Sequence, residues 1–240
     1  RAMTETEWLA CTDPGTMLEF VKGNPSDRQL RLIAVACCRR IMHLLPEERN
    51  RHAVEVAERY ADGAASNDEL AQAYADARRI ADECDPVRLA QYQTAEWDAP
   101  AAYQADGLHY AASTCARAAY PKSLAYAAAI EAAGNYSLAV AMFLRQPERH
   151  AAEEARMADL LRDILGDPFR SVSLQPAWQT PNALALAQGI YEGRAFDRLP
   201  ILADALEEAG CMDADMLSHC RQGGSHVRGC WVLDLILAKR

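Results

Sequence analysis

Thirteen residues near the C-terminus combine the side chains that most often carry chemistry. The stretch "HCRQGGSHVRGCW", from His219 to Trp231, places two histidines, two cysteines and two arginines around a Gly-Gly pair. Imidazole and thiolate are the ligands that zinc prefers, and a thiolate beside an imidazole can act as a nucleophile. A Gly-Gly pair can also simply turn the chain. The stretch therefore has three interpretations: a metal site, a reactive centre, or a packed turn between two helices.

A zinc site would draw its ligands from five residues of this region. If a helix begins after Ser225, two of them share one helix face, and the others could complete a tetrahedral set; the five are Cys211, His219, Cys220, His226 and Cys230. There is no Cys-x-x-Cys pair, however, and the spacing matches no standard structural zinc pattern. His219 and Cys220 would also point about 100° apart on a helix. Zinc is thus an alternative, and we expect no cofactor.

A reactive thiol would be Cys230, which follows Arg228 near the start of a predicted helix. A helix N-terminus and a guanidinium both favour the thiolate, and His226 could serve as the base. The apolar residues that follow, "WVL", favour burial and a quiet thiol instead.

Cys38 is the second candidate for a reactive thiol, because Arg39 and Arg40 follow it. Neighbouring cysteines on a helix diverge, so only Cys37 belongs to the apolar stripe and the pair cannot form a normal disulfide. We interpret Cys38 as a contact between helices.

The packed turn is the interpretation that we favour for the C-terminal stretch. Asp234 interrupts the apolar run "CWVLDLILA", and a carboxylate in such surroundings needs a partner. Arg228 or His226 could provide it. We therefore predict a small polar cluster of His226, Arg228 and Asp234, which is either structural or lines a binding pocket.

Other catalytic signatures are missing from the chain. Phosphate-binding loops, a Gly-x-Ser-x-Gly elbow and a His-Glu-x-x-His helix do not occur, and no Glu-x-x-His tetrad suggests a di-iron bundle. The paired glutamates fall on predicted helix surfaces. We do not expect an enzyme.

Composition narrows the classes of partner. The 240 residues carry a formal net charge of −9, and the pI is about 5.2, so a basic face that tracks nucleic acid is not expected. An acidic helical surface suits a basic protein partner. No apolar run approaches the roughly 18 residues of a membrane span, and the N-terminus lacks a signal sequence. We expect a cytoplasmic protein whose eight cysteines are reduced.

Helix signals recur from end to end and predict an all-α fold of about ten helices. Thr4–Glu7 and Ser26–Gln29 have capping-box spacing, and Asp213 is a further N-cap. Proline and glycine predict breaks between the helices, at Asp85-Pro86, Ala99-Pro100, Tyr120-Pro121, Gly134 and Gln146-Pro147.

The helices should form one compact domain, with lobes expected over residues 1–84, 85–165 and 166–240. The longest irregular stretch, "GDPFRSVSLQPAWQT", runs from Gly166 to Thr180. A loop of this length is either packed by its own side chains or functional, and Phe169 and Trp178 favour packing.

Both ends of the chain resemble an uncharacterised family of bacterial hypothetical proteins that occurs as many paralogues. The resemblance lies in "TETEWLACTDPGTMLEF" and in "RAFDRLPILADALEEAGC" through "HVRGCWVLDLILAKR", of which "HVRGCWVLDLIL" is the most specific piece. It implies a bacterial, soluble protein and brings no activity, cofactor or catalytic residue. The leading hypothesis is a non-enzymatic interaction or adaptor module with an acidic helical surface. The alternative is a small-ligand or zinc-binding protein with its site at "HCRQGGSHVRGC".

Overall fold

The computed structural model describes residues 3–44, 47–93, 100–120, 125–143 and 149–239. These residues form helices, turns and loops without a strand among them, which confirms the predicted all-α fold. The α-helices are α1 (Glu5–Ala10), α2 (Pro14–Phe20), α3 (Asp27–Ile41), α4 (Glu48–Ala61), α5 (Asn67–Gln93), α6 (Pro100–Ala118), α7 (Ala125–Phe143), α8 (Arg149–Leu165), α9 (Pro181–Gly193), α10 (Leu199–Glu208), α11 (Ala214–Arg221) and α12 (Trp231–Ile236).

The capping signals of the sequence act where they were predicted. The Thr4 hydroxyl accepts the backbone N–H of Glu7, and the Glu7 carboxylate accepts that of Thr4, so α1 begins with a complete capping box. Ser26 and Gln29 form a second capping box at the start of α3. The Asp213 carboxylate accepts the N–H of Met216 at 2.9 Å and opens α11.

Two predicted breaks are wrong, because the helices continue through them. α5 runs through Asp85-Pro86, and α7 runs through Gly134. A proline in a helix removes one backbone donor, and a glycine costs about 1 kcal/mol relative to alanine. Packing of α5 on α6 and of α6 on α7 outweighs these local costs. α6 does begin at Pro100 and ends at Ala118, whereas Gln146-Pro147 lies outside the described residues.

The chain divides into two compact units, Arg1–Asp159 and Leu160–Arg240, called here the N-terminal and C-terminal units. The expected lobe boundary at 165/166 falls near this division. The one expected at 84/85 falls inside α5, and the last residues of α8 belong to the C-terminal unit.

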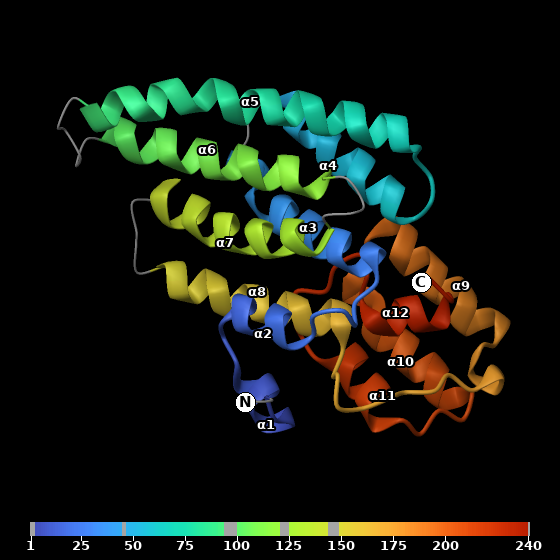
Figure 1. Ribbon diagram of the computed structural model, residues 1–240. Coiled ribbons are helices and arrows are strands. Elements are labelled where there is room, and N and C mark those ends of the chain that lie inside the picture. The colour runs from blue at the N-terminus through green and yellow to red at the C-terminus, as the bar shows by residue number, and fades with distance from the viewer. Residues whose placement is uncertain (1–2, 45–46, 94–99, 121–124, 144–148, 240) are drawn as a thin grey trace. The chain divides into compact units, whose positions relative to one another are not determined.

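Helix α3 is the centre of the N-terminal unit. It packs against α4, α6 and α7, and α5, α6 and α7 lie side by side (Figure 1). Many of the buried side chains of α6 and α7 are alanines, which let helices approach closely but bury little apolar area each.

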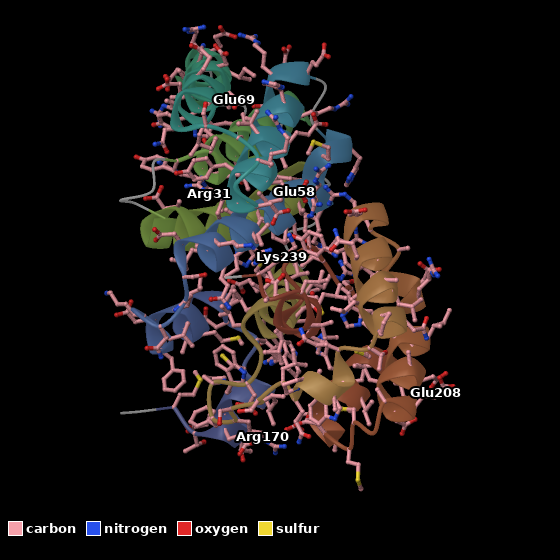
Figure 2. The ribbon with its side chains drawn as sticks, turned by 90° about the vertical axis from the view of Figure 1, so that its right-hand side faces the viewer. Arg31, Glu58, Glu69, Arg170, Glu208 and Lys239 are labelled. Atoms are coloured by element: carbon pink, nitrogen blue, oxygen red, sulfur yellow. The ribbon has the colours of Figure 1, made fainter. Side chains whose placement is uncertain are left out.

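A buried arginine joins α3 to the end of α6. Arg31 donates to the backbone carbonyls of Ala118 at 2.7 Å and Tyr120 at 2.8 Å, and its guanidinium lies over the Tyr60 ring. Arg31, labelled in Figure 2, lies among the helices of this unit. Burial lowers the pKa of Arg31, but the carbonyls at a helix C-terminus are natural partners for a cation.

A second buried network joins α3, α7 and α8 through Tyr136. Arg40 donates to the Tyr136 hydroxyl at 2.6 Å, and that hydroxyl donates to the Glu153 carboxylate, which also pairs with Arg156. Tyr136 and Glu153 are buried. Burial and the hydrogen bond to Glu153 raise the pKa of Tyr136, so the phenol keeps its proton and remains a donor.

The C-terminal unit has its own apolar core, built by α9, α10, α11 and α12 and by Trp178. Trp178 is buried, as predicted for the loop between Gly166 and Thr180, whereas Phe169 of the same loop is 41% exposed. Among the described helices, none has the length and apolarity that a membrane span requires.

We predict that Tyr136→Phe lowers the free energy of unfolding by about 1–3 kcal/mol, because Arg40 and Glu153 each lose a buried hydrogen-bond partner. Tyr60→Phe is the matched control: it removes the same atom from an exposed hydrogen bond to Asn67, and should cost less than about 1 kcal/mol. Urea unfolding followed by circular dichroism measures both. Equal losses would show that the buried network contributes nothing of its own.

Candidate metal centre

A buried carboxylate near the end of α8 is the starting point of the site. Asp163 lies two residues before the last residue of α8, and its side chain is 6% exposed. The C-terminal end of a helix carries partial negative charge, and a buried carboxylate has lost its water, so Asp163 needs positive partners. Two histidines of the C-terminal stretch face it.

His219 reaches Asp163 from the last turn of α11, and His226 comes from the segment that follows. The helix after Ser225 that would put His226 and Cys230 on one face does not form, because α12 starts only at Trp231. The chain turns instead between Val227 and Cys230, where the Cys230 N–H donates to the Val227 carbonyl at 3.0 Å and Gly229 has a φ of 97°. This glycine-dependent turn brings Cys230 back towards the two histidines.

Four side chains of the C-terminal unit meet at one point. One ligand atom from each of Asp163, His219, His226 and Cys230 lies within 4.8 Å of the others, and these residues are called here the four-residue cluster. Oδ1 of Asp163 lies 2.6 Å from Nδ1 of His226 and 3.1 Å from Nε2 of His219. The same Nε2 lies 3.2 Å from Sγ of Cys230.

The hydrogen bonds of His226 need a positive charge at this point. Its Nδ1 faces the Asp163 carboxylate and its Nε2 faces the Gln222 carbonyl at 3.3 Å, so both neighbours are acceptors. Two acceptors require either the imidazolium or a cation between Nδ1 and the carboxylate. Burial opposes the imidazolium, but Asp163 and the Gln222 carbonyl outweigh it and raise the pKa of His226.

The surroundings shift the pKa values of Asp163 and Cys230 in opposite directions. Burial disfavours the Asp163 carboxylate, but hydrogen bonds and charge from His219 and His226 outweigh burial and lower its pKa. Burial, with the Asp163 charge adding to it, raises the pKa of Cys230 well above its ordinary value. Without a bound cation the cluster therefore contains a carboxylate, an imidazolium at His226 and a neutral thiol.

The cluster contains cysteine, histidine and aspartate, but it lacks the geometry of a nucleophilic triad. In a triad the base uses one ring nitrogen towards the nucleophile and the other towards the acid. Here a single nitrogen, Nε2 of His219, faces both Cys230 and Asp163. Side chains that converge on a common point suit the coordination of one ion.

Burial removes the support for a reactive thiol at either predicted position. Cys230 and Cys38 are both fully buried, and burial raises the pKa of both. Arg39 lowers the pKa of Cys38, but its effect is smaller than that of burial. Arg228 stacks on the Tyr191 ring, with its guanidinium carbon 4.5 Å from the ring centroid. Exclusion from water is the larger effect, and a sequence pattern does not reveal it.

The other predicted site residues lie outside the four-residue cluster. Cys220 and Cys211 are buried in the core of the C-terminal unit. Burial raises the pKa of Cys220 to about 12, and its electrostatic interactions with Cys211 and Asp163 add to this effect. Asp234 is buried in α12, as its apolar neighbours suggest. His226, which was grouped with Arg228 and Asp234, is bonded to Asp163; the polar cluster of those three stays a prediction.

Aromatic rings shield the cluster from water. The Trp231 ring packs beside the His219 ring at 5.2 Å, and the His219 and His226 rings are 4.9 Å apart. A side-chain carbon added at Gly166 would make an ordinary contact with the Trp231 ring at 3.4 Å, so it is the positive φ of 69° that favours glycine there. The ring nitrogens therefore lie in a poorly hydrated region, where charges interact strongly.

Asp163 is the member of the cluster that sequence reasoning missed. It precedes His226 by 63 residues, so no local spacing connects them. One signal was present: Asp163 lies on the buried face of α8 among Leu160, Leu161 and Ile164. The reasoning that singled out Asp234 applies equally to this carboxylate.

We predict that Cys230 and Cys38 react with iodoacetamide at least about 100-fold more slowly than Cys11, which is partly exposed, because a buried thiol reacts only when its surroundings open. Peptide mapping by mass spectrometry, after timed alkylation in a chelating buffer at pH 8, gives the rate at each cysteine. Alkylation of Cys230 as fast as that of Cys11 would restore the interpretation of a reactive centre.

Comparison with known proteins adds nothing to this geometry. No protein-family model, no curated protein sequence and no solved structure matches the chain.

Proposed function

We propose that this protein binds one zinc ion through Asp163, His219, His226 and Cys230. The observation that carries the proposal is the convergence of four donors within 4.8 Å, two from buried residues and two from partly buried histidines. A tetrahedral zinc ion, with bonds of about 2.0–2.3 Å, separates its ligands by about 3.3–3.6 Å. The pairs at 2.6, 3.1 and 3.2 Å would open by up to about 1 Å to admit it, and the widest pairs, at up to 4.8 Å, would close by a similar amount.

The donor set favours zinc over other cations. A cysteine thiolate excludes magnesium and calcium, which take oxygen ligands, and a carboxylate is a poor ligand for the soft copper(I) ion. Two imidazoles, one thiolate and one carboxylate are all ordinary zinc ligands.

Charge balance supports a divalent ion. With zinc bound, the two negative charges of Asp163 and Cys230 cancel those of the ion, and both histidines are neutral ligands. Without it, the Asp163 carboxylate is balanced by the His226 imidazolium, and Cys230 keeps its proton. The divalent ion thus takes the place of the protons on Cys230 and His226.

The neighbours of the ligands are of the kind that orient zinc-binding side chains. The Gln222 carbonyl accepts from Nε2 of His226, which leaves Nδ1 as the ligand atom. The Val227 N–H donates to Oδ2 of Asp163 at 2.9 Å, so Oδ1 is the oxygen directed at the ion.

We assign the ion a structural role. Four protein donors complete a tetrahedron, whereas a catalytic zinc keeps one position for water or substrate. Asp163 and Cys230 are 6% and 0% exposed, so a substrate has no direct approach to them.

The predicted acidic surface has less support. Three exposed carboxylates of the C-terminal unit are paired within the chain: Arg221 binds Asp204 and Glu207, and Arg170 binds Asp215. Neutralised carboxylates attract a basic partner less strongly. A protein partner, basic or otherwise, stays a prediction, and zinc binding replaces it as our leading proposal.

We predict one zinc ion per chain after purification and zinc loading, and at least a tenfold weaker affinity in Cys230→Ser and Asp163→Asn, because each removes one negative ligand. Elemental analysis counts the zinc, and competition with a chromophoric chelator gives the affinity. X-ray absorption at the zinc edge should detect one sulfur and three nitrogen or oxygen ligands.

The matched controls for these variants are Cys211→Ser, which changes a buried cysteine outside the cluster, and Asp215→Asn, which changes an aspartate of α11. Both should bind zinc as the wild type does. Loss of zinc in the controls, or its retention at full affinity in both cluster variants, would refute the assignment of ligands.

We also predict that zinc affinity rises with pH. Cys230 must lose its proton to bind, and below the raised pKa of His226 a second proton must leave; the lowered pKa of Asp163 adds none. The affinity should therefore rise at least about tenfold per pH unit between pH 6 and 8. Calorimetry in two buffers with different ionisation enthalpies counts the protons released. An affinity independent of pH would contradict a thiolate ligand.

A further inference from the structure

We infer that zinc works as a latch for the end of the chain: its binding holds the segment 222–230 and α12 in place, and its loss releases them while α9 and α10 stay folded. The inference rests on the proposed zinc site and specifies what occupancy of that site controls. It follows from a difference within the C-terminal unit: the segment 222–230 and α12 have fewer stabilising contacts of their own than α9 and α10 have.

The segment between α11 and α12 has little regular structure and few buried residues to stabilise it. Residues 222–230 include no helix, and Gly223, Gly224 and Ser225 are exposed. A Gly-Gly pair has more conformational freedom to lose on ordering than any other dipeptide. The segment is held to α8 through Asp163, which accepts from the Val227 N–H and bonds to His226.

Helix α12 is short and lacks a side-chain hydrogen bond at its N-terminus. It has six residues, and its N-cap residue, Cys230, makes no side-chain capping hydrogen bond. Isolated helices of this length are unstable in water, so α12 depends on its packing against α9 and α11 and on how its first turn is anchored. Cys230 is both the N-cap of α12 and a member of the four-residue cluster.

Zinc changes the anchoring at this point. Without the ion, the contact of Cys230 with His219 is the 3.2 Å approach of Sγ to Nε2, and sulfur makes only weak hydrogen bonds. With the ion, a zinc–thiolate bond fixes the start of α12 to ligands from α8 and α11. The ion therefore joins three elements at the place where the apolar packing of α12 begins.

Most of the apolar core that α12 packs against comes from the rest of the unit. α9 and α10 contribute Ile190, Tyr191, Leu199, Leu202 and Leu206 to the core, all nearly or fully buried. None of these residues touches the ion in the proposed site. Removal of zinc should therefore loosen the chain locally, because helices held by a large apolar core open far less often than a short terminal helix.

Hydrogen–deuterium exchange on the full chain tests the latch, with zinc in excess and with the protein stripped by a chelator. Free zinc at 100 times its dissociation constant favours the bound state about 100-fold. Amides of residues 226–236 should therefore exchange at least about tenfold faster after chelation, whereas those of α9 and α10 should change less than about twofold.

Two variants control for misfolding. At the same free zinc, Cys230→Ser should exchange at least about tenfold faster in residues 226–236 than the zinc-loaded wild type, because its affinity is at least about tenfold weaker, and Cys211→Ser should give the zinc-loaded pattern. Far-ultraviolet circular dichroism of the chelated proteins should be the same for all three, which shows that the substitutions themselves leave the helices folded.

The outcomes separate the latch from zinc binding itself. If zinc binds with one ion per chain and exchange in 226–236 does not change, the latch is wrong and the proposed function stands. If chelation accelerates exchange uniformly across α9 to α12, the ion supports the whole unit and the latch is again wrong. If no zinc binds, both proposals fail.

Discussion

The burial of one carboxylate, Asp163, dictates the arrangement of the C-terminal unit. It lies near the negative end of α8 and out of water, where an uncompensated charge would cost several kcal/mol. Two histidines and a backbone N–H meet this requirement, and all three come from the last 22 residues of the chain. The end of the chain is folded back because this charge needs partners, and the turn at Gly229 makes the return possible.

The N-terminal unit solves a related problem with different groups. Its alanine-rich helices bury little apolar area per residue, so polar contacts have a large share in specifying how they pack. Arg31 ties α3 to the end of α6, and Tyr136 joins α3, α7 and α8. These networks are satisfied by neighbouring donors and acceptors within hydrogen-bonding distance, which is what allows buried polar groups to persist.

Burial also decides which chemistry suits the cysteines. A thiol removed from water is a poor nucleophile unless a cation stabilises its anion, and for Cys38 the neighbouring Arg39 has only a minor influence on the pKa. Cys230 is equally buried, but it faces two imidazoles and a carboxylate. A divalent ion can supply the positive charge that Cys230 needs, and the same ion removes the need for a proton on His226. Zinc coordination and a buried, unreactive thiol are therefore compatible, whereas nucleophilic catalysis and burial are not.

The sequence alone determined the all-α fold, the start of most helices and three of the four cluster residues, because capping, helical periodicity and residue type are local properties. It misjudged Pro86 and Gly134, where packing between helices outweighs a local cost. It left open a helix from Ser225 that would carry His226 and Cys230, whereas α12 begins only at Trp231. Only the tertiary structure brought Asp163 to the histidines, since their meeting depends on chain folding across 63 residues. A buried charge acts on whatever lies nearest in space, and sequence spacing does not report that distance.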